Sequence, residues 1–178
     1  MGIRHVLPAV AAVLLALPAS VGAAEHYPAR PVKLIVQGAA GSGPDLLARV
    51  VAEQLTRTWK EAVVLHNQPG AGGLIAAQLA AAAPPDGHTL FVPTITTFVI
   101  LPEMHDKLPF DLDRAFVPIG LLAQTPMMFA AAPSQDAASL DDLATLARKR
   151  PGALFYAANN RGSLPHLAAE LWRTKAGR

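Results

Sequence analysis

The sequence predicts an α/β protein built on a parallel sheet, and three observations indicate this fold class. Short runs of β-branched and other apolar residues alternate with longer helical segments from Tyr27 onward. Glycine-rich or small polar turns separate several strands from the helices that follow them. Charged residues make up only 16% of the 178-residue chain, which favours a packed core over disorder. Such an alternation is typical of parallel strands joined by right-handed crossovers.

The first 23 residues have the pattern of a secretory signal peptide. Arg4 and His5 form a short basic region, an apolar run covers residues 6–17, and small residues precede a cleavage position after Ala23. The apolar run is shorter than the ~20 residues that a membrane span needs. We therefore expect residues 1–23 to be removed and the mature chain to lie in the periplasm. An apolar core helix is the alternative interpretation.

Residues 24–123 predict a first α/β lobe. Strands are expected at residues 32–36, 62–65 and 89–92, where apolar residues gather. Pro44 suits the first position of a helix because its missing N–H has no intrahelical partner there. The apolar face of that helix is predicted at Leu47, Val51 and Leu55, with Leu46 and Val50 beside them. Alanine-rich residues 74–83 predict a second helix that ends at the turn of residues 84–87.

Residues 124–178 predict part of a second α/β lobe. Strands are expected at residues 116–123, which lead out of the first lobe, and at 127–132 and 154–157. Ser139 and Asp142 form a capping box at the start of one helix, and the basic residues 148–150 suit its C-terminal end. A last helix is expected from Leu167. Three aromatic residues are expected in the core rather than stacked on a ligand: Trp59, Phe155 and Trp172.

Three turns of one design could carry a binding function: residues 38–45, 67–73 and 158–166. Each joins a strand to a helix, whose N-terminal end leaves about four N–H groups without intrahelical partners. Glycine lets such backbone approach a ligand closely. In a parallel sheet these turns share one edge, so they predict a site for an anion with several oxygens, either a carboxylate or a phosphate. The alternative is that the glycines only form tight turns.

Enzyme and nucleic-acid functions find little support. Ser42 is not in a nucleophile elbow, because Ala40 and Pro44 stand where glycines are needed, and no base is paired with it by pattern. Cysteine is absent, the histidines have no metal-ligand spacing, and no basic cluster accompanies aromatic residues. We expect no catalytic residue, no metal, no cofactor and no nucleic-acid partner. Asp45 either complements the helix dipole or orients the loop or a ligand amine.

The mature chain resembles the Bug family of extracytoplasmic solute receptors, the binding proteins of tripartite tricarboxylate transporters. The likeness runs from Tyr27 to the end of the chain and lies in the number, order and spacing of short motifs. They are Tyr27-Pro28-x-Arg30-Pro31, Gly41-x-Gly43-x-Asp45, Asn67-Gln68-Pro69-Gly70-Ala71-Gly72-Gly73, Pro85-Asp86-Gly87-His88-Thr89-Leu90, Leu108-Pro109-Phe110-Asp111, Phe116-Val117-Pro118-Ile119 and Gly162-Ser163-x-Pro165-His166-Leu167.

The resemblance implies a two-lobed, Venus-flytrap fold of the periplasmic-binding-protein class (type II). It implies a monomeric receptor, not an enzyme, that captures a small organic carboxylate and works with membrane transporter subunits. Closure would occur at a hinge near residues 122–125. The implied ligand-binding residues are Ala39, Gly41, Ser42, Gly43, Asp45, Gly73 and Thr94 from the first lobe, and Asn160, Gly162 and Ser163 from the second.

The chain departs from the family pattern in its first loop and at its end. Ser42 stands where the family usually has glycine, and Pro44 where it usually has threonine, which bears on ligand identity rather than on fold. Family members continue beyond the equivalent of Arg178 to finish the second lobe, so we expect this chain to be C-terminally truncated. The alternatives are a non-functional remnant of such a receptor and a secreted α/β hydrolase.

Overall fold

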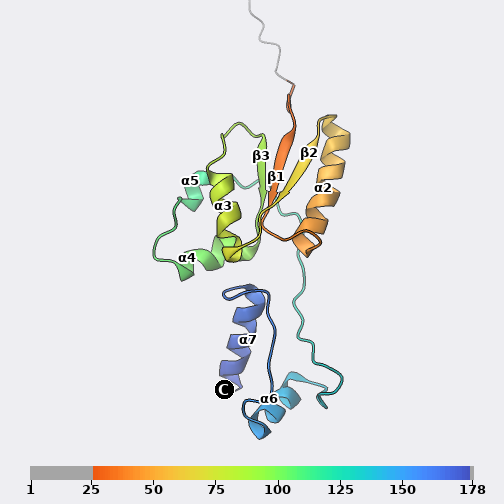
Figure 1. The fold of residues 1–178 in the computed structure, drawn as a ribbon, viewed down its shortest axis with the longest axis vertical. Helices are drawn as coiled ribbons and strands as arrows, with labels where there is room; N and C mark the ends of the chain where they lie inside the picture. Colours follow the sequence, from red (N-terminus) through yellow and green to blue (C-terminus); the bar gives the residue numbers. More distant parts are fainter. Residues whose placement is uncertain (1–25, 177–178) are drawn as a thin grey trace, which may run out of the picture.

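A parallel three-stranded sheet lies within the first part of the protein, at the top of Figure 1. The computed structural model describes residues 26–176, so the predicted signal peptide lies outside the described residues. The strands β1 (Val32–Val36), β2 (Val63–Asn67) and β3 (Thr89–Val92) are arranged in the order β2-β1-β3. All three predicted strands and their parallel pairing are therefore confirmed, and the carboxyl ends of the strands meet at one edge.

The two predicted crossover helices cover opposite faces of the sheet. Helix α2 (Gly43–Trp59) packs on the face that carries Leu34 and Val36. A 3-10 turn, η1 (Ala71–Gly73), leads into α3 (Leu74–Ala81), which contacts β1 and β3 from the other side. Both helices begin at the carboxyl edge of the sheet, as a βαβ connection requires.

The face of α2 that meets the sheet differs in detail from the predicted one. Ala48 and Ala52 are buried in the core, whereas Leu47, Val51 and Leu55 are only half-buried. The flanking positions, Leu46 and Val50, are 56% and 60% exposed. The predicted helix is thus confirmed, but the residues that lie closest to the sheet are the alanines Ala48 and Ala52. Their small side chains let the helix backbone lie close to the strands.

Three short helical segments after β3 were not predicted. A π-helical turn, η2 (Thr96–Ile100), runs directly into α4 (Leu101–Met104), and α5 (Leu112–Ala115) follows. The side chain of Asp111 caps α5 by accepting from the backbone N–H groups of Asp113 and Arg114. Segments of four or five residues are too short to show a helical period in the sequence.

Two helices follow a long irregular connection: α6 (Leu140–Lys149) and α7 (Leu164–Lys175). The predicted capping box is confirmed. Ser139 Oγ accepts from the backbone N–H of Asp142 at 3.1 Å and donates to its carboxylate at 2.8 Å. Arg148 and Lys149 lie in the last turn of α6, also as predicted. Helix α7 begins three residues before the predicted start.

The strands predicted at residues 116–123, 127–132 and 154–157 are wrong: between residues 93 and 176 the structure has no strand. Val117 is 87% exposed and Phe155, predicted to be in the core, is 92% exposed. Apolar, β-branched residues favour strands, but a strand exists only when a neighbouring strand supplies hydrogen-bond partners. Trp59 and Trp172 are half-buried and pack against Tyr27 and Phe129, respectively.

The N-terminal end of α7 faces the carboxyl edge of the sheet (Figure 1). One extended connection runs from α5 to α6, and a second returns from α6 toward that edge and leads into α7 (Figure 1). Among the described residues, no helix is both long and apolar enough to cross a membrane. The division of the chain at residues 123 and 124, and a hinge there, stay predictions.

Candidate functional site

A buried carboxylate, that of Asp45, makes hydrogen bonds that fix the loop between β1 and α2. The carboxylate of Asp45 accepts hydrogen bonds from the backbone N–H of Gly41 at 2.8 Å, from Arg49 Nε at 2.9 Å and from Asn67 Nδ2 at 2.9 Å. These donors, with Arg49 the strongest, lower the pKa of Asp45 to about 2. Asp45 is 0% exposed. In this structure its carboxylate therefore orients the loop.

The same loop presents exposed backbone to solvent. Ala39, Gly41 and Gly43 are exposed, and the backbone N–H of Ser42 donates to the carbonyl of Ala39 at 3.1 Å, which closes a turn. Ser42 is the N-cap residue of α2, but its side chain makes no capping hydrogen bond. Ser42 Oγ is buried without a partner and lies over the backbone of Gly38, where a Cβ would collide with it.

A polar cluster that the sequence analysis missed lies at the ends of β1 and β3. Gln37 Nε2 donates to Thr94 Oγ1 at 2.7 Å, and Gln37 Oε1 accepts from the backbone N–H of Thr94 at 2.9 Å and from Thr97 Oγ1. Gly73 lies directly against this cluster. A Cβ on Gly73 would lie 2.6 Å from Thr97 Oγ1 and 2.8 Å from Gln37 Cδ. Glycine at position 73 is thus required by close packing as well as by its positive φ of 99°.

The loop before α7 faces the carboxyl edge of the sheet (Figure 1). Ser163 is buried and caps α7 by accepting from the backbone N–H of His166 at 3.4 Å. The backbone N–H of Gly162 donates to His166 Nδ1 at 3.3 Å. Asn160 is exposed, and its Nδ2 lies 3.8 Å from the position that a Cβ on Gly72 would occupy.

The predicted residues lie in the loops at the N-terminal ends of α2, α3 and α7 or, for Thr94, just after β3. These helix ends lie at or face the carboxyl edge of the sheet (Figure 1). Backbone N–H groups at these ends favour a negatively charged guest. Asp45 and Ser163 already have partners within the protein. Within residues 26–176 no group of three or more His, Cys, Asp or Glu side chains could hold a metal ion.

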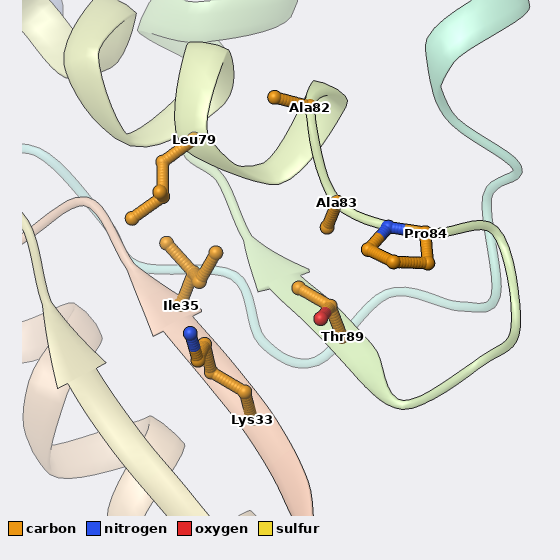
Figure 2. Close-up of a pocket in the computed structure, with 7 residues that line it drawn as sticks. All are labelled: Lys33, Ile35, Leu79, Ala82, Ala83, Pro84 and Thr89. Carbon is orange, nitrogen blue, oxygen red and sulfur yellow. The ribbon is translucent and has the colours of Figure 1, made fainter.

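Two surface hollows lie elsewhere. Figure 2 shows the first, of about 210 Å³, beside the early part of β1 and β3 and the end of α3. It is lined by Lys33, Ile35, Leu79, Ala82, Ala83, Pro84 and Thr89. The second, of about 320 Å³, lies between α3 and the Pro109–Phe110 segment. Neither includes a predicted site residue, and both are largely apolar.

Gln37 and Thr97 are the residues that sequence reasoning missed, whereas Asn67 was included in the candidate turn of residues 67–73 but was given no role of its own. Gln37 directly follows β1 and Asn67 is the last residue of β2, so a polar residue at the end of an apolar strand was the available signal. No signal in the sequence pointed to Thr97, because it lies inside the short segment η2.

The chain matches known proteins over most of its length. Residues 47–178 match the sequence profile described as Tripartite tricarboxylate transporter family receptor. A UPF0065 protein of Bordetella bronchiseptica is 34% identical over 168 residues, which cover 94% of this chain and 50% of that protein. The chain therefore spans about half the length of the curated relatives it matches.

Solved structures are also similar to this chain, over about half of their own length or less. R. palustris Rpa4515, solved with adipate, has a TM-score of 0.79 and 32% identity, over 85% of this chain and 50% of that one. The periplasmic binding protein BugD has a TM-score of 0.66 and 27% identity, with the same coverage. MatC from Rhodopseudomonas palustris, with bound malate, has a TM-score of 0.62 and 31% identity, over 68% of this chain and 42% of that one. These likenesses confirm the predicted fold class of periplasmic binding proteins.

Proposed function

Since this chain belongs to the tripartite tricarboxylate transporter family of receptors, we propose that it binds a small organic carboxylate at the carboxyl edge of its sheet. The proposal includes delivery of that ligand to membrane transporter subunits, without chemical change. Recognition of the family from the short motifs of the sequence is confirmed by the profile match and by the Bug proteins among its relatives.

The observation that carries the proposal is the convergence of three helix N-terminal ends (Figure 1), with glycine-rich backbone between them that is exposed at Gly41, Gly43 and Gly70. Carboxylate oxygens accept hydrogen bonds from such N–H groups without a neighbouring cation. Arg49, one turn into α2 from the first loop, is already paired with Asp45 at 2.9 Å. Adipate and malate in two of the similar structures support a dicarboxylate as the ligand class.

We assign the predicted residues two kinds of role. Ala39, Gly41, Ser42 and Gly43 present backbone to one carboxylate, while Asp45 fixes the shape of their loop. Gly73 and Thr94, supported by Gln37, line the first half of the site. Asn160 and Gly162 approach from the second half, where Ser163 sets the start of α7.

Further parts of the proposal concern the whole protein. We propose that residues 1–23 direct export to the periplasm and that residues 24–123 and 124–178 belong to two lobes. The hinge lies near residues 122–125, and the receptor works as a monomer. A secreted hydrolase finds no support in the site, because Ser42 Oγ has no hydrogen-bond partner and hence no base.

The test is a thermal melt of residues 24–178 with and without adipate, malate and tricarboxylates. A ligand at a hundred times its dissociation constant stabilises the folded state by about 2.7 kcal/mol. We expect at least one dicarboxylate to raise the melting temperature, and a monocarboxylate of matched length to act less. A cooperative melt that none of these acids shifts would contradict the proposal.

A further inference from the structure

Met104, the last residue of α4, lies against the backbone of Gly162 in the loop before α7. Gly162 is buried and has a φ of 79°. A Cβ on Gly162 would lie 2.7 Å from Met104 Cε and would also collide with Sδ. The thioether therefore occupies space that any residue other than glycine would fill. Figure 1 shows α4 at the edge of the sheet that faces α7.

A second glycine makes the reciprocal contact across the same gap. Gly72 has a φ of 65°, and a Cβ there would lie 3.8 Å from Asn160 Nδ2. Within the described residues, no hydrogen bond or ion pair links residues 26–115 to residues 124–176. The approach of residues 124–176 to residues 26–115 thus depends on van der Waals packing. The side chain of methionine is well suited to such packing because it is flexible and polarizable.

We propose that Met104 is a positioning residue for closure, which sets how near the Asn160–Ser163 loop comes to the glycine loop of residues 70–73. The inference rests on the proposed function, since the gap between these loops is the proposed carboxylate site. Met104 is 46% exposed, so a change at this contact does not unpack the core. The length of its side chain then limits the size of ligand over which the two loops can close.

The contact can be tested without any ligand, by measuring the distance between the two parts. The chain contains no cysteine, so Gln54→Cys on α2 and Lys149→Cys on α6 allow a pair of spin labels to be placed at exposed positions. We expect Gly162→Ala to lengthen the mean label distance. The variant Gly162→Ala with Met104→Ala is expected to restore it, because the shorter side chain makes room for the added methyl group.

Gly152→Ala is the matched control. Gly152 also has a positive φ, of 75°, but nothing lies within 4 Å of its Cβ position. Gly152→Ala should leave the label distance unchanged. A change seen only in Gly162→Ala is then due to the contact with Met104 and not to alanine at a positive φ. Met104→Ala alone, which keeps every glycine, should shorten the distance, so the inference stays testable if Gly162→Ala fails to fold. An unchanged distance in Met104→Ala, or no restoration in the double variant, would overturn the inference.

Titration with adipate and malate separates this inference from the proposed function. If closure falls to about a tenth of its population, the apparent dissociation constant rises about tenfold. We expect that loss in Gly162→Ala and its recovery in the double variant. Failure of the unmodified chain to bind either acid would contradict the proposed function, while the label distances would still decide the role of Met104.

Discussion

The side-chain amide of Asn67 joins the loops that follow β1 and β2 by donating to Asp45 Oδ1 at 2.9 Å and to the carbonyl of Gly38 at 3.0 Å. Asn67 ends β2, whereas Gly38 and Asp45 flank the loop that follows β1. The two strands are paired in parallel, so their ends already lie side by side. One amide therefore fixes the relative position of two loops that are 22 or more residues apart in sequence.

Asn67→Ala should loosen the first loop. Each lost hydrogen bond costs about 1 kcal/mol of net stability, and more where a buried acceptor is left without a donor. We expect a lower midpoint in urea unfolding at an unchanged slope, and weaker carboxylate binding. Gln68→Ala is the control, because the side chain of Gln68 makes only one exposed contact, with His66 at 3.3 Å. Equal effects of the two substitutions would contradict the role assigned to Asn67.

The acid dependence of stability should carry a signature of Asp45. Its pKa falls from 3.8 to about 2 on folding, because Arg49, the Gly41 N–H and Asn67 stabilise the carboxylate. A lowered pKa gives stability that is fully present above the unfolded value and is lost as pH falls through the folded value. The difference in unfolding free energy between the wild type and Asp45→Asn should therefore be constant above about pH 5 and shrink toward pH 2.

The measurement is urea unfolding of both proteins at several pH values between 2 and 7. Asp86, Asp142 and Glu170 also have lowered pKa values, so the wild type alone cannot report on Asp45. Subtracting the Asp45→Asn curve removes their shared contribution. A difference that stays constant down to pH 2 would show that the Asp45 carboxylate is not stabilised by folding.

The sequence allowed the first half of this fold to be predicted because its signals are local. Apolar runs located β1 and β3, and Pro44 marked the start of α2. The later strand predictions failed at Val117 and Phe155 because strand propensity does not specify a pairing partner. In the site, the glycine loops were visible in the sequence, whereas the contact of Gln37 with Thr97 depends on a fold that brings residues 60 positions apart together.

Gly73→Ala should be more damaging than its backbone conformation alone explains. A non-glycine residue at positive φ costs about 1–3 kcal/mol. Gly41→Ala is the control, since Gly41 has a φ of 82° but an empty Cβ position. The added methyl at position 73 would also strike Thr97 Oγ1 and Gln37. We expect a larger loss of unfolding free energy for Gly73→Ala in parallel urea titrations, and equal losses would exclude the packing argument.

Ser42→Ala distinguishes a structural hydroxyl from one that meets the ligand. Ser42 Oγ is buried without a hydrogen-bond partner, so its removal should change stability by less than about 0.5 kcal/mol or even increase it. If the hydroxyl turns toward a bound carboxylate, affinity should fall by roughly the tenfold that one hydrogen bond of about 1.4 kcal/mol represents. Calorimetric titration with the acid that raises the melting temperature measures this. Unchanged affinity would remove Ser42 from the ligand contacts and leave recognition in this loop to backbone N–H groups, which the loop keeps whichever side chain occupies position 42.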